Sequence, residues 1–242
     1  MRRFVQAFSG GSGLSPTLPT TLVERLGQLP DRYNISIRQQ AGIVFIQEQR
    51  WKMAEMAWGL IPSWEPEPST RYSTQTARLD RAPSSRMYRR AWSARRCVLP
   101  INGYYKWDRE SSPRQPYFIQ ASSGEVLFAA ALWSAWGDSA TGELLSFSVL
   151  THPNPAIPAP LVADGPLFVP PERIAEWIQA DPRAASRLLQ RMPQFSLEAY
   201  AVSRRVANRK LDDYSLLEPL AANEDFELSL EDGAGDDLDE DG

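Results

Sequence analysis

The sequence predicts an α+β fold with a barrel-like, mostly antiparallel sheet and a few short helices. The length of 242 residues is enough to bury a good core as one domain, or at most two. Short apolar runs typical of strands outnumber the segments with helical spacing. Turn residues such as Asn102-Gly103 separate these runs, which favours many short strands over a few long helices.

The first part of the chain predicts one short helix and the beginning of the sheet. Residues 9–20 are mostly Gly, Ser, Pro and Thr, so a loop is expected there. A short helix is expected over residues 22–29. The alternation over residues 35–47 predicts a hairpin that turns at Gly42, and residues 53–58 form the next expected strand.

The middle of the chain predicts one more helix and most of the sheet. Residues 84–92 have the spacing of a short helix, and Ser84 is a plausible cap. Apolar alternation then predicts a series of strands at residues 95–99, 103–107, 116–120, 126–133 and 144–151.

The last part of the chain predicts two helices, one strand and a tail. A helix is expected to begin at Pro170-Pro171, with an apolar face formed by Ile174, Trp177 and Ile178. A second helix is expected over about residues 183–190, and a strand over 199–206. The domain is expected to span residues 1–220, followed by a disordered acidic tail over residues 221–242.

Cysteine usage and hydropathy favour a folded, cytoplasmic protein. The chain has eight Trp, which excludes disorder of the whole. Its only cysteine, Cys97, lies in an apolar strand pattern and is expected to be a core residue rather than a reactive thiol. No N-terminal run resembles a secretory signal, and no stretch reaches the roughly 18 apolar residues that a membrane span needs.

The net charge of −4 conceals two parts of opposite sign. The tail holds ten acids and no base: Glu224, Asp225, Glu227, Glu231, Asp232, Asp236, Asp237, Asp239, Glu240 and Asp241. Without them, 20 acids face 26 bases, so residues 1–220 have a charge of about +6. Arginine, which provides 23 of the 26 bases, binds phosphate through a planar fork and stacks on bases. The body of the chain therefore suits nucleic acid.

Arginines concentrate in one segment of the body. Between residues 71 and 96 the only acid is Asp80, and the bases are Arg71, Arg78, Arg81, Arg86, Arg89, Arg90, Arg95 and Arg96. A patch of this kind attracts phosphates and gives salt-sensitive binding.

The segment Arg95–Trp107, which reads RRCVLPINGYYKW, resembles the SRAP family, the SOS-response-associated peptidase or abasic-site-processing proteins. Six further segments match the family in order: Met1–Phe4, Arg32–Ser36, Trp58–Trp64, Gln115–Ile119, Leu132-Trp133 and Val202–Asn208. The resemblance covers roughly two hundred residues and implies the family's fold.

The resemblance also implies that four active-site positions have changed. Arg2 stands where the family has its Cys nucleophile, Ser73 where it has Asn, Lys106 where it has Glu, and Val162 where it has His. In the family, the amine and thiol of that Cys capture the aldehyde of an abasic site in single-stranded DNA as a thiazolidine. No catalytic residue of the family type is therefore expected.

The DNA contacts that we expect combine arginines with the loop that carries Trp58 and Trp64, which in the family wedges beside DNA. The expected contact residues are Arg3, Trp58, Leu60, Pro62, Trp64, Arg78, Arg86, Arg89, Arg90, Lys106 and Arg204. The alternative is that both tryptophans belong to the core and that the arginine helix is a solvated face.

Lys106 has three interpretations. It can be a solvated substitution in an inactive pocket, or a phosphate contact. It can also be a desolvated amine that attacks an aldehyde and forms a Schiff base. The α-amine of Met1 is a second candidate nucleophile.

Metal and cofactor sites are not expected. The one histidine, His152, has no Cys or clustered carboxylate around it and is interpreted as a loop residue. No phosphate-binding loop or dinucleotide motif occurs. The acidic tail either competes with DNA for the basic body or only aids solubility.

Together these observations predict a protein that binds single-stranded DNA, including abasic DNA, without a covalent bond in the DNA damage response. It is expected to be a cytoplasmic monomer that joins the nucleoid when bound to DNA. One alternative is residual abasic-site cross-linking or lyase activity through Lys106 or the terminal amine. The other is a protein-interaction scaffold that no longer binds DNA.

Overall fold

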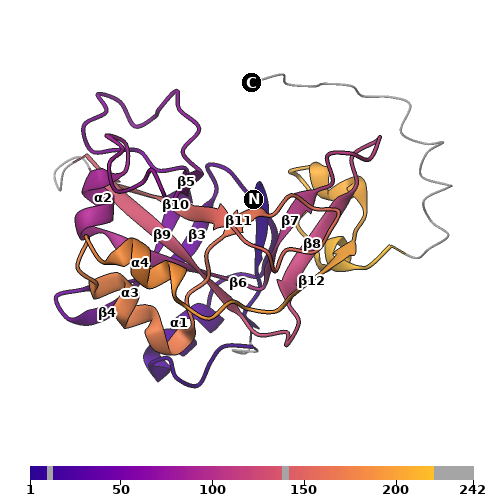
Figure 1. The fold of residues 1–242 in the computed structure, drawn as a ribbon, viewed down its shortest axis with the longest axis horizontal. Helices are drawn as coiled ribbons and strands as arrows, with labels where there is room; N and C mark the ends of the chain where they lie inside the picture. Colours follow the sequence, from indigo (N-terminus) through magenta and orange to yellow (C-terminus); the bar gives the residue numbers. More distant parts are fainter. Residues whose placement is uncertain (10–12, 138–141, 221–242) are drawn as a thin grey trace.

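The computed structural model describes residues 1–9, 13–137 and 142–220, and its strands form two sheets (Figure 1). The smaller sheet has the order β12-β8-β7-β1-β2, and the larger one has the order β11-β10-β4-β3-β6-β9 with β5 beside β10. The strands are β1 (Arg3–Gln6), β2 (Arg32–Ser36), β3 (Gln40–Gln47), β4 (Arg50–Trp58), β5 (Thr76–Arg78), β6 (Arg96–Ile101), β7 (Gly103–Trp107), β8 (Pro116–Ala121), β9 (Leu127–Trp136), β10 (Leu144–Pro153), β11 (Asp164–Pro166) and β12 (Leu197–Ala201). The helices are α1 (Thr20–Gly27), α2 (Arg89–Ala94), α3 (Ile174–Gln179), α4 (Ala185–Gln190) and the 3-10 turns η2 (Pro171–Arg173), η3 (Arg204–Ala207) and η4 (Tyr214–Leu217).

The larger sheet closes on itself. The order β10-β4-β3-β6-β9 returns to β10, because β9 and β10 also pair, from Leu144 opposite Trp136 to Val149 opposite Ala131. Closure leaves no exposed edge along this part of the sheet, so its backbone N–H and C=O groups are paired on both sides.

The two sheets are joined where the chain passes from β6 into β7 at Asn102. The Asn102 side chain accepts a hydrogen bond from the Ala7 N–H (2.7 Å) and donates one to the Ala7 carbonyl (3.0 Å). Gly103 follows, and a Cβ there would lie 2.4 Å from the Ile119 carbonyl oxygen. Only glycine therefore lets β7 approach β8 this closely.

Apolar side chains fill the larger sheet and the space between it and the helices. Cys97, Val98 and Leu99 of β6 have no exposed surface. The apolar face of α3 packs against β6, and the Trp177 indole donates to the Cys97 carbonyl oxygen (2.9 Å). Figure 1 shows α1, α3 and α4 together on one side of this sheet, away from β8 and β12.

A buried arginine ties the helices to the sheet. Arg96 at the beginning of β6 is 5% exposed and donates to the carbonyls of Trp177 (3.0 Å), Trp92 (2.6 Å) and Ala180. Its guanidinium therefore supplies the donors for carbonyl groups near the ends of α2 and α3.

The predicted fold class is confirmed: the sheets are largely antiparallel and the helices are few and short. The expected strands over residues 95–99, 103–107, 116–120, 126–133 and 144–151 all exist, and several extend further. The apolar face of α3 and the core position of Cys97 are confirmed as well. No helix among the described residues is both long and apolar enough to span a membrane.

Three expectations about local structure are wrong. The first hairpin turns at residues 37–39, where Arg38 has a φ of 70°, and Gly42 lies inside β3. The helix α2 begins at Arg89 rather than near Ser84 and has no side-chain cap. The last strand ends at Ala201 and a 3-10 turn follows. The acidic tail lies outside the described residues.

Substitution of Arg96 by Gln should lower the free energy of unfolding by about 3 kcal/mol, because buried carbonyls then lose their charged donor. Urea denaturation measures this value. The matched control is Arg89→Gln, which replaces an exposed arginine of α2 and should change stability by less than about 0.5 kcal/mol. Equal effects of the two substitutions would contradict a structural role for Arg96.

Candidate functional site

The candidate site surrounds the first residue of the chain, at the edge where the two sheets meet (Figure 1). Strand β1 pairs with β7, with Arg3 opposite Tyr105 and Phe4 opposite Tyr104. One step back along this register brings Arg2 beside Lys106. Side chains alternate along a strand, so Tyr104 and Lys106 share one face of β7.

Strand β11 forms the opposite wall of the site. It pairs with the end of β10, with Asp164 opposite Pro153 and Gly165 opposite His152. The Lys106 ammonium donates a hydrogen bond to the Asp164 carbonyl oxygen. The half-buried position of Lys106 lowers its pKa, the charge of Asp164 acts in the opposite direction, and Arg109 lowers the pKa further.

The α-amine of Met1 lies among these charges. Burial lowers the pKa of this amine from 8.0 to about 5; the charges of Lys106, Arg2 and Arg109 act in the same direction, and Asp164 opposes them. Where Met1 is the terminal residue, its amine is neutral and nucleophilic at pH 7. We call Met1, Arg2, Lys106, Arg109 and Asp164 the N-terminal site.

A buried hydroxyl borders this site. Among the described residues the Tyr104 hydroxyl has no hydrogen-bond partner, and burial and the charge of Asp164 both raise its pKa. It lies close to β11, because a Cβ added to Gly165 would be 3.2 Å from the hydroxyl oxygen. Tyr104 therefore brings a neutral, unused donor close to the N-terminal site.

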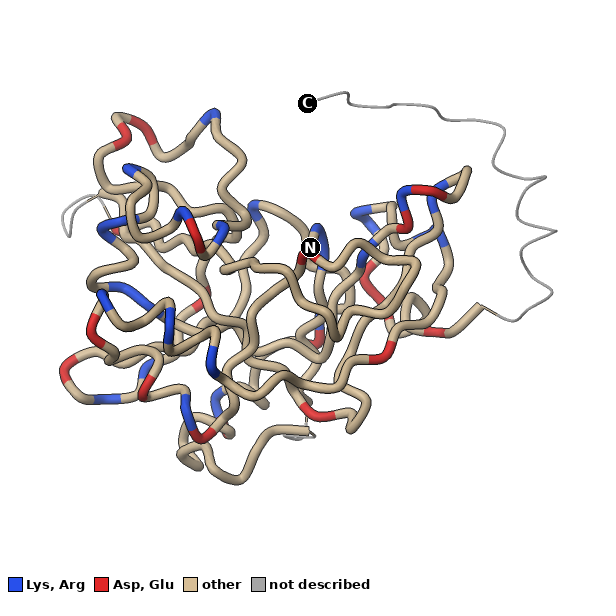
Figure 2. The backbone as a smooth tube through the Cα atoms, in the orientation of Figure 1, with Lys and Arg blue, Asp and Glu red and all other residues tan. Residues whose placement is uncertain are grey.

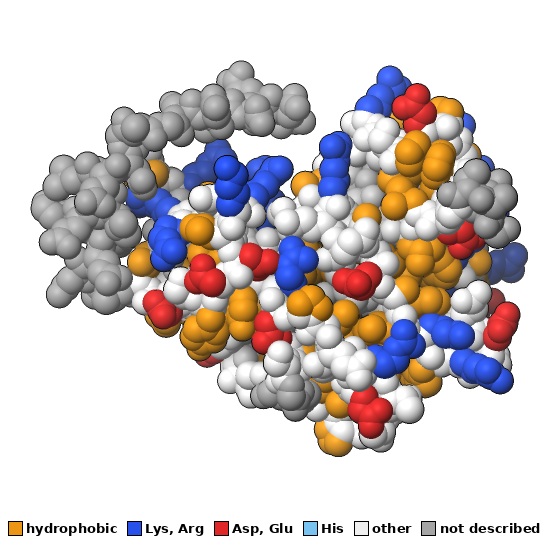
Figure 3. Space-filling model, turned by 180° about the vertical axis from the view of Figure 1, so that it is seen from behind, with side chains coloured by type: hydrophobic (Ala, Val, Ile, Leu, Met, Phe, Trp, Pro, Cys, Tyr) orange, Lys and Arg blue, Asp and Glu red, His pale blue; other side chains and the backbone are white. Residues whose placement is uncertain are grey.

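The site has an excess of positive charge over the one carboxylate of Asp164. Figure 2 shows Lys and Arg positions close to the N-terminus, and Figure 3 shows such side chains gathered along the same edge from behind. This arrangement can attract a phosphate group, and its two amines can react with an aldehyde.

Strand β5 approaches the same region from the other side of β10. Arg78 lies opposite Thr151 and forms a two-pronged ion pair with Asp80, with distances of 3.1 and 3.2 Å. The charge of Asp164 also raises the pKa of Arg78, though less than Asp80 does, so Arg78 lies near β11. Ser73 precedes the strand, is exposed, and donates to the Gln75 side chain. Val162 is 47% exposed.

Arg3 is not available for a ligand, contrary to expectation. It is 8% exposed, and its guanidinium donates to the Asn34 side chain (3.0 Å) and to the Ala207 carbonyl (2.6 Å). Burial and the charge of Arg209 lower its pKa to about 10. The guanidinium fastens the segment around η3 to the smaller sheet.

The expected wedge loop is mostly buried. Trp58 has no exposed surface, donates to the Gln75 carbonyl (2.8 Å) and packs edge-on against Phe4. Leu60 and Pro62 are buried too. The alternative interpretation, that Trp58 belongs to the core, therefore holds. Trp64 differs, because it is 40% exposed.

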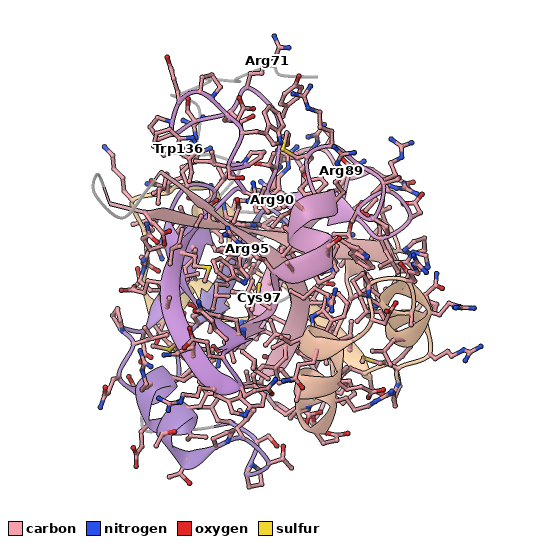
Figure 4. All side chains as sticks on the ribbon, turned by 90° about the vertical axis from the view of Figure 1, so that its left-hand side faces the viewer. Arg71, Arg89, Arg90, Arg95, Cys97 and Trp136 are labelled. Atoms are coloured by element: carbon pink, nitrogen blue, oxygen red, sulfur yellow. The ribbon has the colours of Figure 1, made fainter. Side chains whose placement is uncertain are left out.

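Arg71, Arg89, Arg90 and Arg95 lie on the side of the molecule that Figure 4 shows. The guanidinium of Arg86 lies 4.5 Å from the centre of the Trp64 ring, and Arg90 donates to the Ser63 hydroxyl (2.8 Å). Arg89 is exposed. The structure thus brings Trp64, Arg86, Arg89 and Arg90 into one region, apart from the N-terminal site.

The remaining candidates lie elsewhere. Arg204 begins η3 and is partly buried, and its Nε finds no hydrogen-bond partner in the part of the chain that the structure describes. His152 lies within β10 opposite Gly165 and not in a loop, which corrects our expectation. Across residues 1–9, 13–137 and 142–220, no three His, Cys, Asp or Glu side chains are grouped in a way that could hold a metal ion.

Sequence reasoning missed the roles of Asp164, Arg109 and Tyr104 in this site. Tyr104 lies in the motif Arg95–Trp107, but no local pattern groups it with Asp164 and Arg109, because the site forms only through the pairing of β1 with β7 and of β10 with β11. A prediction of strand register could have brought them together.

Comparison with known proteins identifies relatives over most of the chain. The family model described as SOS response associated peptidase (SRAP) matches residues 12–209. The abasic site processing protein YedK of Escherichia coli is 26% identical over 196 residues, covering 78% of this chain and 85% of that protein. The abasic site processing protein HMCES of Xenopus tropicalis is 35% identical over 121 residues, covering 41% of this chain and 36% of that protein.

Solved structures share the fold. A protein from Bacteroides thetaiotaomicron superposes with a TM-score of 0.74 at 18% identity, covering 91% of this chain and 99% of that one. A protein from Bordetella bronchiseptica gives a TM-score of 0.64 at 19% identity, covering 84% of this chain and 100% of that one.

The buried amine of Met1 predicts a pH dependence of stability. Its pKa is about 5 in the folded protein against an ordinary 8.0, so the unfolded chain binds the proton more tightly. This contribution is complete above pH 8 and is lost as the pH falls toward 5, by up to about 4 kcal/mol.

Urea denaturation between pH 5 and pH 8 tests this prediction on the free amine and on N-terminally acetylated protein. Acetylation removes the titrating group, so the acetylated form should have the flatter profile. Parallel profiles would show that the amine does not titrate in this way.

Proposed function

We propose, because this chain belongs to the SOS response associated peptidase (SRAP) family, that it is a DNA damage protein that binds single-stranded DNA, including DNA with abasic sites. Relatives named abasic site processing proteins support the damaged-DNA partner. We further propose that the binding is non-covalent and that the protein acts in the cytoplasm as a monomer, joining the nucleoid when DNA is bound.

The observation that supports this proposal most is the charge of the N-terminal site. Lys106 stands where the family has Glu, and it lies with Arg2 and Arg109 around the Met1 amine. A carboxylate at this position would repel a phosphate, whereas the ammonium attracts one. Lysine at this position thus favours binding of the DNA backbone over acid-base catalysis.

The absence of a thiol beside the terminal amine supports non-covalent binding. Met1 has a thioether and Arg2 has no sulfur, so the amine has no neighbouring thiol with which to close a stable ring. Val162, at the position of the family His, has no group that moves a proton.

The residue of this chain that occupies the position of the family Asn can be assigned differently. Ala77 and Arg78 on β5 repeat the Ala-Arg of the family motif Asn-Ala-Arg, so we propose Thr76 as the residue in the Asn position, rather than Ser73. Thr76 begins β5 and pairs with Val149 of β10, whereas Ser73 lies outside the strand. Either residue lacks the amide of Asn.

Incubation with intact and abasic single-stranded oligonucleotides, followed by native and denaturing gels, tests the proposal. We expect a shift on native gels for both strands and no band that survives denaturation. Lys106→Gln should weaken binding and reduce the salt slope by about 0.7, the value for one lost phosphate contact on a single strand. The control Lys52→Gln, on β4, should bind like the wild type.

The other outcomes of this experiment have definite meanings. A band that survives denaturation supports covalent chemistry and contradicts the non-covalent proposal. No shift on either gel contradicts DNA binding and supports a protein-interaction scaffold.

A second candidate function is reversible aldehyde chemistry at the same site. The observation that favours it is the lowered pKa of both amines, at Met1 and Lys106. A neutral amine would attack the aldehyde carbon of a ring-opened abasic sugar, and the carbonyl oxygen would leave as water, giving an imine. Borohydride would then deliver hydride to that carbon and fix the link as a secondary amine.

If this second function operates, borohydride should trap an adduct with abasic single-stranded DNA. For the Met1 amine, the trapped yield should stay near its maximum from pH 8 to about pH 6 and fall below pH 5 as the amine becomes protonated. Mass spectrometry of the adduct and the Lys106→Ala variant assign the nucleophile. No adduct with the wild type at any pH would remove this candidate.

A further inference from the structure

A small hollow opens between α2, the loop before it and β9, away from the N-terminal site. Its lining includes Pro62, Ser63, Trp64, Arg90, Arg95 and Trp133, which we call the α2 hollow. Figure 4 shows Arg90 and Arg95 one above the other on this side of the molecule, with Arg89 beside them on α2. The chain's first residue lies on a different edge (Figure 1).

Both arginines of the α2 hollow are held in place by neutral groups. Arg90 donates to the Ser63 hydroxyl (2.8 Å). The guanidinium of Arg95 lies 4.8 Å from the centre of the Trp133 ring, and the Arg95 carbonyl accepts from the Trp133 N–H (2.9 Å). Neither anchor neutralises a positive charge, and each fixes the direction of a planar fork.

The two guanidiniums lie close enough to repel each other. Burial and, next, the charge of Arg90 lower the pKa of Arg95, while Glu143 acts in the opposite direction. Within the described ranges, no carboxylate lies within ion-pair distance of either arginine. An anion between them would relieve this repulsion and would accept donors from both forks.

The hollow also offers an aromatic surface. Trp64 lines it and is 40% exposed, and the Arg86 guanidinium lies 4.5 Å from its ring centre. Trp133 also lines it and is partly exposed. Exposed tryptophan beside positive charge is the combination with which proteins bind single-stranded nucleic acid, through base stacking and phosphate contacts.

We propose that the α2 hollow binds a phosphodiester group of a single strand, with Arg90 and Arg95 on the phosphate and Trp64 beside the adjoining base. This inference rests on the proposed function and extends it, since it gives the strand a second contact beyond the N-terminal site. The segment from Trp58, which packs against Phe4 of β1, to Pro62, which lines the α2 hollow, is mostly buried and connects β1 to the hollow through the core. A short strand can occupy the N-terminal site alone, whereas a longer one reaches both.

The test measures the affinity of intact single strands of about 4 and about 16 nucleotides over a range of salt concentrations. The proteins are the wild type, Arg90→Gln, Arg95→Gln and the control Arg50→Gln, which replaces an exposed arginine at the beginning of β4. Arg90→Gln and Arg95→Gln should each lower the affinity for the long strand roughly tenfold and reduce the salt slope of that binding by about 0.7. Neither should change the affinity for the short strand. Urea denaturation confirms that all four proteins are folded.

The results separate this inference from the proposed function. If the variants bind the long strand like the wild type, with an unchanged salt slope, the proposal for the α2 hollow is wrong and the proposed DNA binding still holds. An equal loss of affinity for both strands also contradicts it, because the arginines would then act only through long-range electrostatic attraction. If the wild type binds neither strand, the proposed function itself fails.

Discussion

The position of β10 is the constraint on which the rest of the structure depends. Its first half pairs with β9 on one side and β4 on the other, which closes the larger sheet. Its second half pairs with β5 and β11 on these same two sides. Because backbone hydrogen bonds fix each register, Arg78 and Asp164 are delivered to the same end of β10. The smaller sheet then brings β7 and the first residues of the chain to that end.

Arginine has two physical roles in this protein, and burial separates them. Arg3 and Arg96 lie inside and donate to amide and carbonyl oxygens, where they hold the segments near η3, α2 and α3 in place. Arg90 and Arg95 contact a hydroxyl and an indole ring instead, and no described carboxylate lies within ion-pair distance of either. A count of arginines cannot separate a scaffold that needs donors from a surface that attracts anions.

The N-terminal site combines an excess of positive charge with two amines whose pKa values are lowered. Burial, and next the charge of Lys106, lower the pKa of the Met1 amine, and burial also lowers the pKa of Lys106. The same proximity provides positive charge for a phosphate while either group remains protonated. The charge of Asp164 raises the pKa of both amines and so opposes this lowering. The proposed binding and the proposed aldehyde attack therefore depend on the same two groups, and each needs a different protonation state of them.

Sequence alone determined the fold class, most strands, the apolar face of α3 and the core position of Cys97, because apolar periodicity follows from which face is buried. It also gave the family, through ordered local motifs such as Trp58–Trp64. It failed for the turn near Gly42, for the exposure of Trp58 and for the use of Arg3. Those depend on partners far along the chain. The Gln6 side chain accepts a hydrogen bond from the Gly42 N–H, and Asn34 and Ala207 accept hydrogen bonds from Arg3. Tertiary structure decides which side of a strand faces a partner sheet and which buried arginines meet carbonyl acceptors. These contacts form only when the sheets close, because they join residues that share no local pattern.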